Sequence, residues 1–303
     1  MDRRTFLGTL TAATVLSRNL AWATAQHKAQ PIGVQLYTVR DEMEKDLDGT
    51  LAKVAAIGYK NVELAGFSVG QSAPDQGKIK YFKRSPQELR AAFDRYGLSV
   101  ISAHVNYKSL APENFSAVIE ASRVLGQTYI INPSVDDEIR KQPDGWKRIA
   151  AVLNQAGEMS KKSGIQFGYH NHRFEFAARN GKSPYDILLE ECDPNLVKME
   201  MDLCWIIVAG GDPVKYFERY PGRFPLVHVK DMKRIPPVPA PGAPDPDPLD
   251  AMTDVGSGVI DWKRIFTHSK TAGIKYYIVE HDKPKAPFDS IKASYDYLEK
   301  LRF

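Results

Sequence analysis

Short apolar runs alternate with amphipathic stretches along most of the chain, and this alternation repeats eight times. The apolar runs are rich in β-branched and aromatic residues, which is typical of parallel strands covered on both faces. The predicted strands are Ile32–Tyr37, Asn61–Ala65, Ser99–Val105, Tyr129–Asn132, Ile165–Asn171, Val197–Asp202, Phe224–Lys230 and Tyr276–Asp282.

The amphipathic stretches have the spacing of helices, with apolar residues recurring every three or four positions. Ser85-Pro86-Gln87-Glu88 is a typical helix start. Ser85 can cap the helix, Pro86 suits its first turn, and the side chain of Glu88 can accept a hydrogen bond from the backbone amide of Ser85. Gly58 and Gly126 stand where helices are expected to end. The predicted helices cover 47–57, 86–96, 114–125, 144–162, 184–191, 212–220, 261–272 and 288–301.

Strict alternation of strand and helix predicts a parallel sheet, and eight units favour its closure into a (β/α)8 TIM barrel. A doubly wound sheet would carry a glycine-rich turn after its first strand, whereas Tyr37-Thr38-Val39-Arg40 contains no glycine. A chain of 303 residues is long enough for one such barrel, which we expect to span residues 26–303.

A proline-rich segment, 236–248, falls between the strand Phe224–Lys230 and the helix 261–272. It is long for a connection between a strand and a helix, and such loops lie on the catalytic face of a barrel. It is therefore expected to form either a lid over the site or a surface insertion.

The first 25 residues have the pattern of a twin-arginine signal peptide. Arg3-Arg4 precedes an apolar stretch from Phe6 to Leu16, and Ala23-Thr24-Ala25 is a cleavage motif. The alternative is a chance arginine pair before an apolar helix. The signal interpretation predicts export to the periplasm in the folded state, with cleavage after Ala25 and no membrane association afterwards.

Composition excludes some classes of protein. Apolar residues make up 43% of the chain and charged residues 26%, which is typical of a globular protein. The net charge is only +4, and no basic run is interleaved with aromatic residues, so nucleic-acid binding is not expected. Oligomerisation stays open.

Polar side chains cluster at the carboxyl ends of the predicted strands, which meet at one end of a barrel. Leaving several charged groups buried there without partners would cost several kcal/mol each, and a divalent cation would balance them. The alternative is a hydrogen-bonded network without metal. The clustered candidates are Glu63, His104, His170, His172, Glu200, Asp202, His228, Lys230 and Glu280.

Four of these residues are the predicted metal ligands, because they end four consecutive strands: His170, Asp202, His228 and Glu280. A mixed nitrogen and oxygen set suits one Mn, Co, Fe or Zn ion better than Mg or Ca. Glu200 shares a side of its strand with Asp202, but Asp202 is nearer the end. His172 could replace His170 or contact the substrate.

The same blocks resemble the sugar phosphate isomerase/epimerase family of xylose isomerase-like barrels. The resemblance covers nearly the whole chain after the signal. It is carried by Tyr169-His170-Asn171-His172, Met199-Glu200-Met201-Asp202, His228-Val229-Lys230-Asp231, Val255-Gly256-Ser257-Gly258 and Val279-Glu280-His281-Asp282.

The resemblance implies an activity on a small carbohydrate. In the family a Glu, an Asp, a His and a second Glu bind the metal, and the two Glu residues move protons. Asp202, His228 and Glu280 match the last three positions, whereas His170 stands at the first.

We therefore expect a divalent-metal-dependent isomerase or epimerase of a sugar or keto-sugar that acts through an enediolate intermediate. A lyase or dehydratase acting on a keto-polyol or 3-keto-glycoside is the alternative, because His170 is a poor member of a two-carboxylate proton shuttle. A non-catalytic sugar-binding barrel is the third hypothesis.

The remaining roles follow from chemistry. Glu280 is the expected base, with Glu200 as its rival. Lys230 is expected either to stabilise an oxyanion or to form an ion pair with Asp231 or Glu200. Substrate contacts are predicted for Glu63, His104, His172 and Trp205, although Glu63 and His104 could instead fill a polar layer of the barrel and Trp205 could pack in the core.

Overall fold

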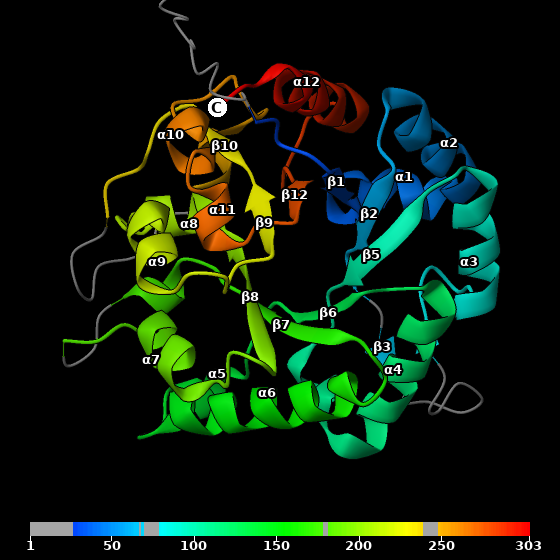
Figure 1. Cartoon of the computed structure of the whole chain (residues 1–303). Helices are drawn as coiled ribbons and strands as arrows, with labels where there is room; N and C mark the ends of the chain where they lie inside the picture. Colours follow the sequence, from blue (N-terminus) through cyan, green and yellow to red (C-terminus); the bar gives the residue numbers. More distant parts are fainter. Residues whose placement is uncertain (1–26, 67, 70–78, 178–180, 239–247) are drawn as a thin grey trace, which may run out of the picture.

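Eight parallel strands form one sheet, confirming the predicted fold class (Figure 1). The computed structural model describes residues 27–66, 68–69, 79–177, 181–238 and 248–303. The sheet order is β5-β2-β1-β12-β9-β8-β7-β6. Its strands are β1 (Ile32–Gln35), β2 (Asn61–Leu64), β5 (Ser99–Ala103), β6 (Tyr129–Asn132), β7 (Gln166–His170), β8 (Val197–Asp202), β9 (Leu226–Val229) and β12 (Tyr276–Val279).

The two ends of this sheet meet and close the barrel. His104, just after β5, forms a parallel bridge with Ile131 of β6. The amide of Val105 donates to the carbonyl of Ile131 over 2.7 Å. The closure therefore brings His104, a predicted site residue, to the rim of the barrel.

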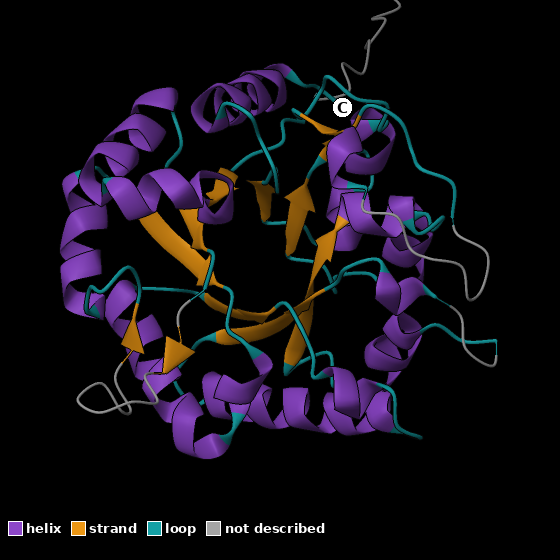
Figure 2. Ribbon diagram, turned by 180° about the vertical axis from the view of Figure 1, so that it is seen from behind, coloured by secondary structure: helices purple, strands orange, loops and turns teal. Residues whose placement is uncertain are grey.

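Helices surround the strands on the outside (Figure 2). The predicted helices are confirmed within about two residues, except that 261–272 is split in two. Around the break, Thr267 and His268 side chains bond the carbonyls of Lys263 and Arg264 and compete with the helical ladder. The helices are α2 (Leu47–Ile57), α3 (Pro86–Arg95), α4 (Pro112–Leu125), α6 (Gly145–Lys161), α7 (Pro184–Glu191), α9 (Pro213–Arg219), α10 (Trp262–Phe266), α11 (Ser269–Ala272) and α12 (Pro287–Lys300).

Several short elements were not predicted, because two to six residues are too few to show a periodicity. They are the helices α1 (Arg40–Lys45), α5 (Asp137–Arg140) and α8 (Leu203–Val208), the antiparallel pairs β3 (Ser68–Val69) with β4 (Ile79–Lys80) and β10 (Asp231–Met232) with β11 (Met252–Thr253), and the 3-10 turns Leu36–Val39, Tyr107–Leu110, Phe174–Phe176 and Leu249–Ala251.

The inside of the barrel is apolar at one level and polar at the next. Leu226 of β9 and Ile278 of β12 belong to a buried cluster that also includes Ile131. His228 and Glu280 follow Leu226 and Ile278 by two residues and so share their inward face. The polar site therefore rests on an apolar floor.

The predicted signal peptide, 1–25, and most of the loop 236–248 lie outside the described residues. In the part of the chain that the structure describes, no helix has the length and hydropathy needed to cross a membrane.

Asp231, at the start of β10, anchors the loop that leads to α10. Its buried carboxylate accepts hydrogen bonds from the backbone amides of Met232, Gly256, Gly258 and Ile260 and from the indole of Trp262. A β-carbon on Gly258 would lie 2.1 Å from this carboxylate, so the glycine is required there.

We predict that Asp231→Asn lowers the free energy of unfolding by roughly 2–4 kcal/mol. The charge that these donors face is lost, and an amide group turns toward some of them. Asp261→Asn is the matched control, because Asn caps a helix as well as Asp does. Urea denaturation measures both variants, and equal stability would contradict the anchoring role.

Candidate metal centre and active site

A cavity of about 850 Å³ opens at the carboxyl ends of the strands. Six predicted site residues line it, namely His104, His170, His172, Trp205, Lys230 and Glu280. Glu63, Glu200, Asp202 and His228 are fully buried and are not among the residues that line this cavity. The predicted residues therefore form two layers, one facing the cavity and one behind it.

Asp202 is held where β8 turns into α8. One carboxylate oxygen, Oδ1, caps α8 by accepting the amide of Trp205 over 2.8 Å. The side-chain amide of Asn171 pairs with the backbone of Asp202 in both directions, which continues the ladder between β7 and β8. Oδ2 accepts no hydrogen bond, although the ammonium group of Lys230 lies 3.1 Å away.

Three of the four predicted ligands come together here, and the fourth, His170, lies beside Asp202. Ligand atoms of Asp202, His228 and Glu280 lie within 4.8 Å of one another. His170 Nε2 lies 3.9 Å from Asp202 Oδ2. This buried carboxylate oxygen accepts no hydrogen bond but is paired with the ammonium group of Lys230. With two imidazoles and a second carboxylate nearby, the donor set fits a divalent transition metal ion. These residues could therefore hold the predicted ion.

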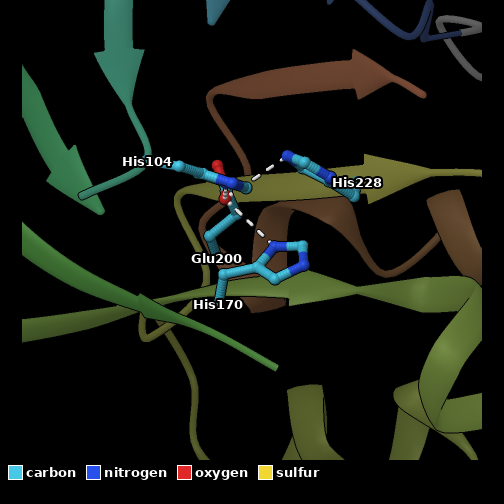
Figure 3. Close-up of side chains that lie close together, drawn as sticks. All are labelled: His104, His170, Glu200 and His228. Atoms are coloured by element: carbon cyan, nitrogen blue, oxygen red, sulfur yellow. Dashed lines mark hydrogen bonds and ion pairs between the residues drawn. The ribbon is translucent and has the colours of Figure 1, made fainter. Parts of the chain in front are cut away.

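A second group shares two of these histidines (Figure 3). Figure 3 shows the rings of His104, His170 and His228 gathered around the carboxylate of Glu200. Glu200 Oε2 lies 2.9 Å from His104 Nε2, 3.1 Å from His170 Nδ1 and 3.3 Å from His228 Nε2. This group also has atoms suited to a metal ion.

Lys230 links the carboxylates at the edge of the cavity. Its ammonium group lies 2.8 Å from Glu280, 2.9 Å from Asp282 and 3.1 Å from Asp202. The ion pair expected with Asp231 or Glu200 is therefore wrong, because Glu280 and Asp282, just after β12, lie on the side that faces Lys230.

Burial and charge set the ionisation of these groups in opposite directions. Burial alone would lower the pKa of Lys230, but Asp202 and Asp282 outweigh it and raise this pKa well above its ordinary value. Burial would raise the pKa of Glu280, yet the charges of Lys230 and His228 hold it below its ordinary value. Glu280 is therefore ionised at neutral pH.

His172 lines the cavity as a neutral imidazole. Burial, together with the charge of Lys230, lowers its pKa to about 3. Its Nδ1 has no hydrogen-bond partner in the described structure. Its backbone amide donates to the buried carboxylate of Glu175, which also accepts the hydroxyl of Tyr169. His172 therefore offers an unpaired ring nitrogen in a fixed position.

Trp205 lies beside Lys230, whose ammonium group is 5.3 Å from the centre of the indole ring. Arg40, Asp282 and Lys283 also line the cavity but were not among the predicted site residues. Asp282 lies two residues after Glu280, so the period of a strand could have found it. Arg40 and Lys283 lie beyond the strand ends, and no periodic signal marks them.

The model of the xylose isomerase-like TIM barrel family matches residues 51–301. The chain belongs to this family. The resemblance inferred from the strand-end motifs is therefore confirmed.

Two enzymes named inosose dehydratase are among its relatives. The one from Lacticaseibacillus casei is 27% identical over 176 residues, which cover 54% of this chain and 57% of the relative. The chain thus matches little more than half of that enzyme. The one from Geobacillus kaustophilus is 24% identical over 308 residues, which cover 86% of this chain and 97% of the relative.

Solved structures agree on the fold. A sugar phosphate isomerase/epimerase from Parabacteroides distasonis superposes with a TM-score of 0.73 at 25% identity, covering 91% of this chain and 96% of that one. The IOLI protein, whose structure contains a zinc atom, superposes with a TM-score of 0.64 at 15% identity. The superposition covers 89% of this chain and 96% of that one. The relatives are enzymes, and this chain is an enzyme of the same family.

Proposed function

We propose that this enzyme is a divalent-metal-dependent dehydratase of a cyclic keto-polyol, the class to which an inosose belongs. The observation that carries the proposal is the arrangement along one edge of the cavity. The ionised carboxylate of Glu280 and the ammonium group of Lys230 lie 2.8 Å apart, beside the unbonded oxygen of Asp202.

Elimination beside a ketone removes a proton from the carbon next to the carbonyl and a hydroxyl group from the following carbon. The electron pair of the C–H bond forms the new C=C bond, and the hydroxyl leaves with a proton as water. Such a reaction needs one base and stabilisation of charge on the carbonyl oxygen, not two matched carboxylates. An imidazole at position 170 is compatible with it.

The residues divide these tasks between them. His170, Asp202, His228 and Glu280 would hold the metal ion, which supplies Lewis acidity toward the ketone oxygen. Glu280 accepts the proton from carbon. Lys230, kept protonated by Asp202 and Asp282, stabilises the negative charge that develops on oxygen. His172 Nδ1 and the indole face of Trp205 orient the hydroxyl groups and the ring of the substrate.

Isomerisation or epimerisation of a sugar is the second candidate. It was the leading expectation from sequence, and the P. distasonis relative favours it. The two inosose dehydratases favour elimination.

A product assay separates the two reactions. The metal-loaded enzyme is incubated with a panel of inososes and keto-sugars, and products are identified by mass spectrometry and NMR. We expect a product that has lost one water from an inosose. An isomer of unchanged mass, formed from any member of the panel, would replace elimination by isomerisation.

Export is a separate proposal, because residues 1–25 lie outside the described structure. We predict that Arg3→Lys with Arg4→Lys leaves the protein in the cytoplasm with its signal uncleaved. Cell fractionation in a host with a working twin-arginine pathway measures this, with Lys28→Arg as the matched control. Normal periplasmic accumulation of the double variant would show that the arginine pair is not an export signal.

A further inference from the structure

We propose that Glu63 and Glu200 are positioning residues that hold His228 and His170 in opposite tautomers. Each carboxylate binds one ring nitrogen and leaves the other nitrogen of that ring turned to the metal centre. This inference rests on the proposed metal centre and assigns to the two buried glutamates a role other than substrate contact or base.

His228 lies between two carboxylates. Its Nδ1 is 2.7 Å from Glu280 Oε2, on the side of the proposed metal, and its Nε2 is 2.7 Å from Glu63 Oε1. A nitrogen this close to a carboxylate must carry a proton, since two lone pairs would repel each other. By this rule both nitrogens of the metal-free ring carry a proton. The Nδ1 proton faces Glu280, itself a proposed ligand, and is the one that a bound ion would displace, which leaves Nε2 protonated toward Glu63.

His170 has the reverse arrangement. Its Nδ1 lies 3.1 Å from Glu200 Oε2, and its Nε2 faces Asp202 Oδ2 at 3.9 Å. With Nδ1 protonated toward Glu200, the lone pair of Nε2 points to Asp202. The two rings therefore present different nitrogens to the same centre.

The supporting carboxylates are themselves fixed. Glu63 accepts hydrogen bonds from the Gln35 amide at 2.8 Å and the Ser102 hydroxyl at 2.5 Å. His104 Nε2 lies 3.1 Å from Glu63 and 2.9 Å from Glu200, so it joins the two. Both glutamates are fully buried and cannot turn away into solvent. Carboxylates that orient ligating histidines in this way commonly strengthen metal binding 10- to 100-fold.

A second metal ion among His104, His170, Glu200 and His228 is the rival explanation for this cluster. An ion there would use His170 Nδ1 and His228 Nε2, the nitrogens that we assign to protons. One ion per chain is therefore expected by elemental analysis, and two ions would overturn the assignment.

Histidine tautomers can be observed directly. In the ¹⁵N-labelled, zinc-loaded full chain, long-range ¹H–¹⁵N spectra should show His228 protonated at Nε2 and His170 protonated at Nδ1. The assignment is overturned if the two histidines have the same tautomer, or if either has the tautomer opposite to this.

The second test measures metal affinity. Glu63→Gln and Glu200→Gln keep the size of the side chain but remove its charge, and each should weaken Co²⁺ binding about tenfold or more. Glu175→Gln is the matched control, because Glu175 is equally buried but bonds Tyr169 and the backbone of His172 and neither ligand ring. It should change the affinity less than twofold.

Unchanged affinity in both folded variants would overturn the positioning role. If one variant does not fold, the other tests the same statement on its own histidine. Neither measurement involves a substrate, so a chain with the expected tautomers and affinities but without dehydratase activity would contradict only the proposed reaction.

Discussion

Glu280→Gln is expected to lower turnover about 10²- to 10⁴-fold, the contribution of a positioned general base. The amide keeps the size of the side chain and one carbonyl oxygen but cannot accept a proton. Glu280 is the candidate because its carboxylate is ionised, lines the cavity and lies 2.8 Å from Lys230. The variant must be compared with the wild type at matched metal occupancy.

Two rivals for the base are tested in the same assay. Glu200→Gln should lower turnover through weaker metal binding, so its loss should be largely recovered at saturating metal. His172→Gln removes the unpaired ring nitrogen at the cavity. If saturating metal restores the turnover of Glu280→Gln but not that of Glu200→Gln, the base is Glu200 on β8 instead. Full activity of Glu280→Gln combined with loss in His172→Gln would assign the base to His172.

Asp202→Asn is expected to remove most of the bound metal from the purified protein. The variant loses the charge of the oxygen around which the proposed ligands gather, while Asn still caps α8 as Asp does. Elemental analysis should therefore find a folded protein with little metal and little activity.

Asp212→Asn is the control for Asp202→Asn. Asp212 also caps a helix, α9, but lies away from the cavity and pairs with Arg264. Its metal content should equal that of the wild type. Full metal occupancy in Asp202→Asn would contradict the proposed centre.

The fold could be predicted from the sequence because each strand is a short apolar run followed by a helix of clear periodicity. The unit around β7 and α7 is an example: Ile165–Asn171 was predicted against the observed Gln166–His170, and 184–191 matches Pro184–Glu191. Short elements such as α8 could not be predicted, because six residues that directly follow a strand are too few to show a helical periodicity of their own.

The site was predicted in part. Strand ends brought three of the proposed ligands together, Asp202, His228 and Glu280, whereas His170 groups with His104, Glu200 and His228 and lies 3.9 Å from Asp202. The partners of Lys230 could not be predicted, because they depend on the distance between β8, β9 and β12. Sequence also could not place Glu63 behind His228, since 165 positions separate the two residues along the chain.

Solvent exchange tests the central claim, that this cavity removes a proton beside a ketone with the help of a bound metal. An inosose is incubated in deuterated water with the metal-loaded enzyme, the chelated enzyme and the chelated enzyme after metal is restored. We expect deuterium at the carbon next to the ketone, or loss of water from the inosose, in the first and third samples and neither in the second. Saturable binding of the inosose without exchange or water loss in any sample would contradict it and leave a sugar-binding barrel without catalysis.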